Sequence, residues 1–501
     1  MAYQPPASPG TLVRASMDYA RHQPEQTLLY QVVEEYYSKF INYLAESDKT
    51  LPQYVQDEFE AYLKCGRLEH GFLRLQCETC PHEQLLAFSC KRRGFCPSCG
   101  AKRMVESAAL LVDEILPLRP VRQWVLSIPY PLRWLFSNDP AALSKALGVV
   151  TRAISSYLIK KSGLTHKRAK TGAVTIIQRF GSALNLNVHF HMLFLDGVYI
   201  VDSETKEGVF QPIEAPTPKD LKKLLHKISE RMICLLERKG LVERDAEQSF
   251  LTLDGKEDEL MHHLQGSSIT YRIAVGPQRG KKVHTLQTLP AQGEPEGISE
   301  HALVAKEGGF SLHAGVSAKA HERGKVERLC RYIARPAVSI HRLERGEGGK
   351  ISYELKTPYR NGTTHVLFEP LDFIARLAAL VPKPRVHLTR FHGVFAPNNK
   401  HRPMVTSEAK GRKNKSKATK EQCLEEPPRA AMTWAMRLKR VFNIDITICR
   451  YCQGVVKVIA CIEERQVIDK ILAHINKQES SKPLTTFLGI RAPPYVSKPA
   501  A

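Results

Sequence analysis

Two histidines, His189 and His191, are the residues of this chain best placed to bind a metal ion. They lie in the segment LNLNVHFHMLFLDGVY, where they alternate with apolar residues. Because side chains of a β-strand point alternately to its two faces, both imidazoles lie on one face and the apolar residues on the other. Two nitrogen donors on one face of a strand form half of a metal site. The alternative is a pair of hydrogen-bonded structural histidines on a half-exposed strand.

The chain is strongly basic, with 73 Lys and Arg against 51 Asp and Glu and a formal net charge of +22. A charge of this size predicts a polyanionic partner, DNA or RNA. The 501 residues, 43% of them hydrophobic, are sufficient for about two to four domains. We find neither the charged and apolar regions of a signal peptide nor an apolar run of about 18 residues. We therefore expect no membrane association and a cytoplasmic location, associated with the nucleoid.

The cysteines are clustered, and in a reducing compartment this indicates metal ligands rather than disulfides. Two CxxC pairs follow one another fifteen residues apart: Cys77 with Cys80, and Cys96 with Cys99. This spacing predicts one structural Zn²⁺ held by the four thiolates of a ribbon. A second zinc or another choice of ligands is the alternative. The additional candidates in the same segment are Cys65, His70, His82 and Cys90.

Two further features accompany the cysteine pairs. Basic residues flank the second pair and favour DNA contact, although a zinc-stabilised spacer with a basic rim is the alternative. These residues are Lys91, Arg92, Arg93, Lys102 and Arg103. Cys449 and Cys452 form a third CxxC pair, which is only half a ribbon. That pair either holds zinc with distant or intermolecular ligands or is a plain turn between strands.

The segment KVERLCRYIARPAVS predicts an amphipathic helix with Tyr332 on its polar face. Pro336 ends this helix. At about 100° per residue, Arg328 and Arg335 share the face of the tyrosine. A tyrosine surrounded by arginines indicates a reactive phenol or a phosphate contact. The alternative is a surface tyrosine that caps the helix.

A tyrosine and a histidine-bound cation can together cleave and rejoin a nucleic acid strand. The phenol attacks a phosphodiester and forms a covalent phosphotyrosine. The cation polarises the scissile phosphate, and the arginines offset charge that develops on the phosphoryl oxygens. The covalent bond retains the energy needed for rejoining, so no nucleoside triphosphate is required. Consistent with this, the chain contains no GxxxxGK[ST] phosphate-binding motif.

Four segments, in this order, resemble the bacterial rolling-circle transposases of the HUH-tyrosine group, of the insertion-sequence-ninety-one type and its common-region relatives. They are CETC with SCKRRGFCPSC, then QRFGSALNLNVHFHMLFLDGVY, RYIARPAVS and RFHGVFAPNNKHR. The resemblance implies that His189 and His191 bind Mg²⁺ or Mn²⁺, that Tyr332 is the nucleophile, and that the cysteines form a zinc-binding domain. Members nick one strand at an element end, become joined to its 5′ phosphate, and transfer single-stranded DNA into a target.

The chain departs from some members, which have two tyrosines four residues apart, because Arg328 stands four residues before Tyr332. A single-tyrosine scheme that uses a second subunit, and hence a homodimer, or a free 3′ hydroxyl fits better. The third metal ligand is open as well. Gln178 is the first candidate, because a carboxamide oxygen suits a hard cation, and Asp196 is the second.

These segments predict an α+β fold, in which an HUH nuclease domain has a central antiparallel sheet with helices on one face. Strands are expected at 123–128, 174–180 and 188–195, and helices at 31–45 and 139–161. The expected domains are an N-terminal helical region (1–60), a zinc ribbon-like domain (61–104), the nuclease domain (105–340), a transposase extension (341–405), a basic linker (406–428) and a small C-terminal module with CxxC (429–501).

The expected function is that of a transposase acting on DNA, mainly on single-stranded element ends and target. A plasmid or phage replication initiator or relaxase uses the same chemistry, and only the zinc segment and the later motifs separate it from a transposase. A second alternative is a non-catalytic, zinc-dependent DNA-binding regulator, in which the histidines and Tyr332 have structural roles.

Overall fold

The chain divides into two compact units. The computed structural model describes residues 23–80, 82–201, 208–244, 249–251, 260–290, 303–406, 436, 439 and 445–479. The smaller unit contains 1–23, 66–88 and 429–501, and the larger contains 24–65 and 89–428. The expected zinc ribbon-like domain, 61–104, is therefore divided between the two units. Residues 1–22 of the expected N-terminal region and 407–428 of the expected linker lie outside the described residues.

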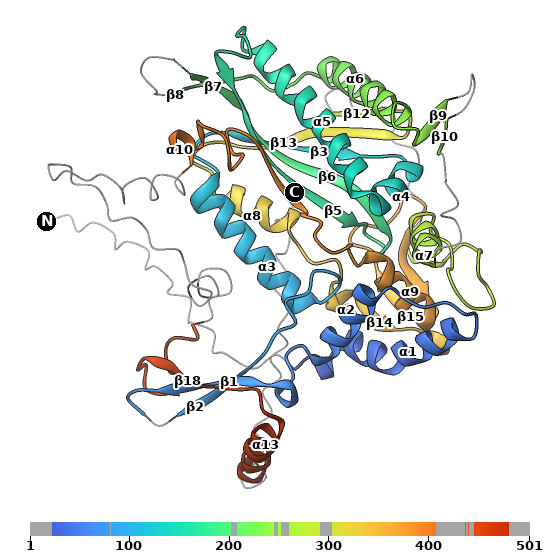
Figure 1. The fold of residues 1–501 in the computed structure, drawn as a ribbon, viewed down its shortest axis with the longest axis vertical. Helices are drawn as coiled ribbons and strands as arrows, with labels where there is room; N and C mark the ends of the chain where they lie inside the picture. The colour runs from blue at the N-terminus through green and yellow to red at the C-terminus, as the bar shows by residue number, and fades with distance from the viewer. Residues whose placement is uncertain are drawn as a thin grey trace, which may run out of the picture. The chain divides into compact units, whose positions relative to one another are not determined.

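A six-stranded antiparallel sheet forms the centre of the larger unit (Figure 1). Its strands, in spatial order, are β12 (Val304–Glu307), β13 (Phe310–Ala318), β3 (Val121–Ser127), β6 (Leu186–Leu195), β5 (Gly172–Phe180) and β17 (Thr389–Gly393). The three strands predicted from the sequence are confirmed as β3, β5 and β6. The strand that carries the two histidines is thus an interior strand, bonded on both sides, which holds its side chains in place.

Three helices cover one face of this sheet: α4 (Tyr130–Asn138), α5 (Pro140–Lys161) and α6 (Pro218–Glu237). The apolar positions of β6, such as Phe190 and Met192, are fully buried beneath them. Helix α5, predicted at 139–161, begins where the Asp139 carboxylate accepts hydrogen bonds from the N–H groups of Ala141 and Ala142 at 2.8 and 2.9 Å. A capping box of Thr217 and Asp220 starts α6.

Helices also cover the opposite face, so the expectation of helices on one face is wrong. This second layer consists of α3 (Pro97–Leu110), the π-helical turn η3 (Leu111–Ile115) and α8 (Arg323–Ile333). Val326, Cys330 and Ile333 of α8 pack there against the sheet residues Val174 and Leu193. The histidine-bearing face is polar only near the histidines and apolar farther along the strands, which is why it supports a second helical layer.

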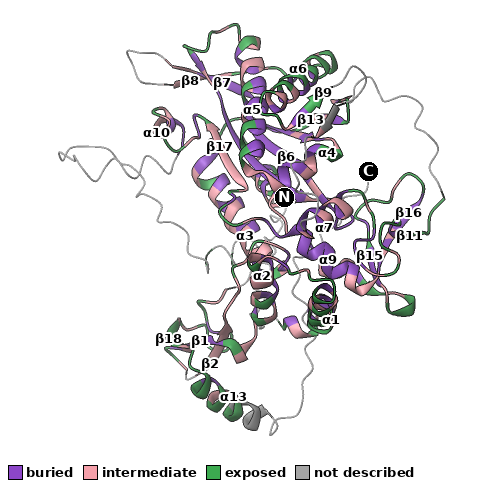
Figure 2. Ribbon diagram, turned by 45° about the vertical axis from the view of Figure 1, so that its right-hand side comes forward, coloured by how far each residue is buried: buried purple, intermediate pink, exposed green. Residues whose placement is uncertain are grey.

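The remainder of the larger unit packs around a four-stranded antiparallel sheet. Its strands, in spatial order, are β11 (His284–Gln287), β16 (Thr363–Phe368), β15 (Ile351–Glu354) and β14 (Leu343–Arg345). The helices that share its core are α1 (Leu28–Ala45), which confirms the helix predicted at 31–45, α2 (Gln53–Lys64), α7 (Leu260–Ile269) and α9 (Pro370–Leu380). Figure 2 shows that α9 is largely buried. Within it, Asp372 and Arg376 form an ion pair at 3.1 Å.

Several shorter elements complete the larger unit. The strands are β4 (Ala169–Lys170), β7 (Gly197–Val201) and β8 (Gly208–Pro212) in one sheet, with β9 (Val242–Arg244) and β10 (Ser249–Leu251) in another. The helices are η1 (Pro24–Gln26), η5 (Ile340–Arg342), η6 (Glu347–Gly349) and α10 (Arg402–Val405). Across the described part of the chain, no helix has both the length and the apolar character needed to cross a membrane.

The smaller unit joins two segments that are distant in the sequence. Strand β1 (Phe72–Cys77) lies between β2 (Glu83–Ala87) and β18 (Val456–Ile462), and both pairings are antiparallel. The unit also contains η2 (Leu68–His70) and α13 (Arg465–Glu479). The segment expected to form a separate C-terminal module therefore shares a sheet with the β1–β2 hairpin.

Candidate functional site

The His189 and His191 side chains lie on the face of β6 that α8 covers, and they point to the same place. Their Nε2 atoms are 3.1 Å apart. Two ligands in adjacent positions of an octahedral cation, with bonds of about 2.1 Å, are separated by about 3 Å. The spacing of the two nitrogens therefore fits a small divalent cation.

Both imidazoles are in the protonation state that a metal ligand needs. Burial lowers the pKa of His189 to about 4 and that of His191 to about 2. Both rings are consequently neutral near pH 7. The backbone carbonyl of Asn187 lies 2.9 Å from Nδ1 of His189, and it accepts the proton of that nitrogen. This hydrogen bond leaves the lone pair on Nε2 for a cation.

His191 has a side-chain partner, Gln123 of the neighbouring strand β3. The amide nitrogen Nε2 of Gln123 lies 2.8 Å from Nδ1 of His191, and both side chains are buried. The oxygen and nitrogen of an amide exchange places by a half-turn, and the hydrogen-bond network decides between them. A half-turn of the amide would put its oxygen at Nδ1, so that His191 donates to Gln123 and Nε2 of His191 is free to bind a cation. Sequence reasoning missed Gln123, because a lone glutamine in a strand carries no signal of its own.

Gln178, the first candidate for a third ligand, lies on β5 directly opposite His189. Directly opposed residues of antiparallel strands have Cβ atoms about 5 Å apart and point to the same face. The Gln178 Nε2 donates to the carbonyl of Ile333 at 3.2 Å, whereas its Oε1 is buried and has no hydrogen-bond partner among the described residues. This unpartnered oxygen is suited to a hard cation.

Asp196, the second candidate for that ligand, is committed elsewhere. Its carboxylate accepts two hydrogen bonds from Arg122, at 2.7 and 3.0 Å. It also lies five residues beyond His191, a separation of roughly 16 Å along a strand. Asp196 therefore forms an ion pair at the end of β6 and does not reach the histidines.

Tyr332 lies on α8 beside the histidine pair. The centres of the Tyr332 and His191 rings are 6.2 Å apart, in an edge-on arrangement. The tyrosine is 41% exposed, in contrast to the buried residues Val326, Cys330 and Ile333 of the same helix. The predicted amphipathic helix, with Tyr332 on its polar side, is therefore confirmed, and the fold brings the phenol and the imidazoles together.

Two cations flank the Tyr332 ring. The Arg335 guanidinium and the Lys356 ammonium each lie 4.3 Å from the ring centre. Partial burial raises the pKa of Tyr332, but Arg335 and Lys356 together outweigh it, and the net effect is a pKa below the usual value. Lys356 was not predicted, because it follows β15 in a different sheet and only the tertiary fold brings it to α8.

Arg328, expected beside Tyr332, is exposed and extends the other way. Its Nη1 lies 3.6 Å from the position that a Cβ would occupy at Gly324, one turn nearer the start of α8. A shared helical face therefore brought only one of the two predicted arginines to the phenol.

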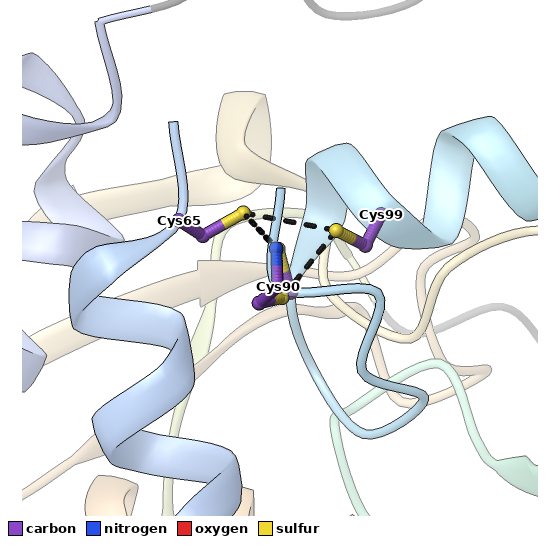
Figure 3. Close-up of side chains that lie close together, drawn as sticks. Cys65, Cys90 and Cys99 are labelled. Atoms are coloured by element: carbon purple, nitrogen blue, oxygen red, sulfur yellow. Dashed lines mark hydrogen bonds between the residues drawn. The ribbon is translucent and has the colours of Figure 1, made fainter. Parts of the chain in front are cut away.

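The cysteines form two groups, of which the first lies in the larger unit and is called here the core cluster. It consists of Cys65, Cys90, Cys96 and Cys99. Figure 3 shows three of these side chains with their sulfur atoms turned toward one another. The sulfur of Cys65 lies 3.7 Å from those of Cys96 and Cys99, and the sulfurs of Cys90 and Cys99 are 3.4 Å apart. Sulfurs of a tetrahedral zinc with bonds of about 2.3 Å are separated by about 3.8 Å, so the group fits Zn²⁺.

The second group, the terminal cluster, lies in the smaller unit. Its members are Cys77, Cys80, Cys449 and Cys452. The Cys77 and Cys452 sulfurs are 3.4 Å apart, and those of Cys80 and Cys449 are 3.6 Å apart. The predicted single site made of Cys77, Cys80, Cys96 and Cys99 is therefore wrong in its grouping. The first pair ends β1 at a hairpin tip, whereas the second starts α3 in the other unit, and each pair has different partners.

The structure also shows which of the alternative zinc ligands belong to a cluster. Cys65 and Cys90, which the sequence left as alternatives, complete the core cluster. His70 and His82 belong to neither cluster. The His82 ring instead packs edge-on against Tyr451, with ring centres 4.5 Å apart.

Comparison with known families gives two matches. Residues 172–402 match a family model described as "Putative transposase", named Y2_Tnp. Residues 32–128 match the transposase zinc-binding domain of the insertion-sequence-ninety-one (IS91) type. Searches of curated proteins and of solved structures returned no match. The first match contains the histidine pair and Tyr332, and the second contains the whole core cluster.

Proposed function

Because the chain belongs to the transposases of the insertion-sequence-ninety-one type, we propose that it cleaves one DNA strand at its element's ends through attack by Tyr332. In this step the phenolic oxygen bonds to the scissile phosphorus, and the bond from phosphorus to the 3′ oxygen breaks. The phenol loses a proton and the 3′ oxygen gains one. The product is a 5′-phosphotyrosine, whose bond energy supports rejoining to a target strand in rolling-circle transposition.

The observation that carries this proposal is the position of Tyr332 between a histidine pair and two cations. Arg335 and Lys356 favour the phenolate and offset charge on the phosphoryl oxygens. His189 and His191, with Oε1 of Gln178, would hold Mg²⁺ or Mn²⁺. Such a cation, when bound, polarises the scissile phosphate. Arg328, exposed on the same helix, is available to contact flanking DNA.

We further propose that the substrate is single-stranded DNA and that the second half of the reaction uses a second copy of the chain or a free 3′ hydroxyl. The support for the second part of this proposal is Arg328, which occupies the position where a two-tyrosine enzyme has its other nucleophile. One chain therefore supplies one phenol to the site. A homodimer supplies two.

The core cluster is proposed to bind a structural Zn²⁺. Its four sulfurs have the spacing of a tetrahedral site, and Cys96 and Cys99 begin α3, the helix that packs on the histidine-bearing face of the sheet. Zinc binding there would fix the start of α3.

The test is formation of a covalent protein–DNA adduct with labelled single-stranded element ends in Mn²⁺. Wild type is expected to form the adduct and Tyr332→Phe to form none. The matched control is Tyr130→Phe, because Tyr130 is another exposed tyrosine, 50% exposed, with Arg133 over its ring at 4.5 Å. Tyr130 lies on α4, which covers the opposite face of the sheet. The control variant should form the adduct at the wild-type rate.

Three results would contradict parts of the proposal. An adduct in Tyr332→Phe would refute the nucleophile. Cleavage that persists in His189→Ala, at unchanged metal dependence, would refute the metal site. DNA binding without any adduct in the wild type would favour a non-catalytic regulator.

A further inference from the structure

A cavity of about 340 Å³ lies beside the candidate active site, within the larger unit. Its walls come from the start of α3, the end of β5, the segment after α8 and the segment before β17. This volume is at the lower end of the range for ligand sites, which is about 300–1,000 Å³.

The cavity is lined by five arginines, and its described lining contains no carboxylate. They are Arg92, Arg93, Arg103, Arg179 and Arg335. Three carboxylates offset part of this charge, one of which is Glu106 near Arg103, and the thiolates of the core cluster add further negative charge. Asp57 lies 3.8 Å from Arg92, and Glu58 accepts a hydrogen bond from the N–H of Gly94 at 2.6 Å. Arg93 and Arg103 donate to backbone carbonyls. The charged side chains of the lining itself are all positive.

Arg179 is the most informative of the five. Its side chain is 7% exposed, and its Nε and Nη2 have no hydrogen-bond partner among the described residues. Buried donors without an acceptor are costly, and a buried guanidinium without an anion more so. A native protein retains such a group where a ligand supplies the acceptor.

The cavity shares two lining residues with the candidate active site. Arg335 lines it and also lies over the Tyr332 ring. Gln178, opposite His189, lines it too. The Phe180 ring, 5.5 Å from the Arg335 guanidinium, adds an aromatic surface. Arginines together with an aromatic ring are typical of sites that bind single-stranded nucleic acid.

We propose that this cavity binds a phosphodiester group of single-stranded DNA, adjacent to the phosphate that Tyr332 attacks, and that Arg179 is its central ligand. The phosphate oxygens accept from the Arg179 guanidinium, and the neighbouring base packs on Phe180. The proposal rests on the proposed function, because it takes the substrate of that site as its ligand. It adds a binding subsite that holds the strand in register with the nucleophile.

The experiment measures the affinity of the full-length Tyr332→Phe protein for a labelled oligothymidylate over a range of salt concentrations. Arg179→Met in this background should weaken binding about tenfold to a hundredfold, as loss of charged hydrogen bonds predicts. It should also reduce the salt slope by about 0.7, the value for one phosphate contact in a single strand. Its thermal midpoint should stay the same or rise, because an unpaired buried charge is removed.

Two further variants complete the design. Arg92→Met removes a lining side chain that is 40% exposed, and it should weaken binding in the same direction, so the proposal does not depend on the folding of one variant. Arg152→Met is the matched control, because Arg152 is exposed on α5, over the opposite face of the sheet. It should leave affinity and salt slope close to those of the parent.

Equal affinity and slope for Arg179→Met, Arg92→Met and Arg152→Met would overturn the proposal. Inorganic phosphate or thymidine monophosphate that binds the parent but not Arg179→Met, with oligonucleotide affinity unchanged, would assign the cavity to a free phosphate and also overturn it. The adduct assay on Tyr332 is separate. If the arginine variants bind DNA like the parent while Tyr332 forms the adduct, only the subsite proposal is wrong. If the arginine variants bind more weakly but Tyr332 forms no adduct, only the proposed function is wrong.

The terminal cluster independently carries a second inference: we infer that it binds a second Zn²⁺, which joins the C-terminal segment to the β1–β2 hairpin. Cys77 and Cys80 come from the hairpin, and Cys449 and Cys452 from a segment beyond both family matches. The ligand atoms of all four lie within 4.8 Å of one another. Pairing of β18 with β1 provides the scaffold.

Zinc content of the full-length protein tests this inference. The wild type should bind two zinc ions per chain. The double variant that combines Cys449→Ser and Cys452→Ser should bind one. Cys234→Ser is the matched control, because Cys234 is an exposed free cysteine on α6, and it should retain two. One zinc in the wild type, or two in the double variant, would overturn the inference. Proteolysis should also release the C-terminal segment from the double variant alone.

Discussion

Substitution of Gln123 tests whether the histidine pair is a metal site whose second ligand needs an oriented ring. In the structure, the Gln123 amide and Nδ1 of His191 are 2.8 Å apart, and the two residues are 4% and 5% exposed. With the amide turned so that its oxygen faces Nδ1, Gln123 is the acceptor for Nδ1–H, and Gln123→Leu keeps the volume but removes that acceptor. A buried donor without a partner costs about 1–3 kcal/mol. Loss of an outer partner of a metal-binding histidine lowers metal affinity about 10–100-fold, which corresponds to about 1.4–2.7 kcal/mol of binding free energy. This loss of binding free energy agrees with the cost of the unpaired donor.

The assay is nicking of a labelled single-stranded oligonucleotide over a Mn²⁺ titration, together with direct Mn²⁺ binding. The half-saturating Mn²⁺ concentration should rise about 10–100-fold in Gln123→Leu, with near wild-type nicking at saturation. Gln123→Glu should restore affinity, because a carboxylate accepts the same proton. Gln265→Leu is the matched control, since Gln265 is a fully buried glutamine on α7, and it should change nothing in the metal titration.

Unchanged Mn²⁺ dependence in Gln123→Leu, with a lower rate at every concentration, would refute this reasoning. It would mean that Gln123 acts on packing or on the substrate. Tighter Mn²⁺ binding in the same variant would also refute it, because the glutamine would then donate to Nδ1 and hold His191 in the wrong tautomer.

Three further predictions concern a cation at this site, a buried ion pair in α9 and the zinc of the core cluster. Lys356→Met should lower the single-turnover cleavage rate about tenfold or more at saturating DNA, because it removes one cation over the Tyr332 ring; an unchanged rate would exclude Lys356 from the chemistry. Asp372→Ala should lower the free energy of unfolding by about 3–5 kcal/mol in urea, since Arg376 would remain buried without its ion pair; a loss below about 1 kcal/mol would contradict this. A strong zinc chelator should expose residues 89–99 to protease. An unchanged fragment pattern would contradict a structural zinc in the core cluster.

The periodicity of the sequence was sufficient to predict the orientation of side chains within a single strand or helix. Alternation in β6 put His189 and His191 on one face, and helical spacing in α8 put Tyr332 on the polar face of its helix. Both statements depend only on backbone geometry within one strand or one turn, which neighbours in the sequence specify. The same logic failed for Arg328. A shared helical face does not determine which way a long, flexible side chain extends.

Grouping of the cysteines shows the limit of spacing as a guide. The separation of the two CxxC pairs matched that of a zinc ribbon, yet each pair has a different set of partners. The deciding contact is the pairing of β1 with β18, between segments separated by most of the chain. No local pattern encodes a pairing of that range, because it depends on which strand edges remain available after the rest has folded.

The sequence by itself determined the types of chemistry present: an imidazole pair on a strand, a phenol among arginines, thiol pairs for zinc and a strongly basic chain. Only the tertiary structure decided how they combine. It placed Gln123 against His191, Lys356 over Tyr332, and the unpartnered Arg179 in a cavity beside them. The physical reason is that each of these contacts joins different strands, helices or sheets. The distances in these contacts follow from strand register and helix packing. In the sequence, each of these residues is a single polar side chain, which does not reveal its partner.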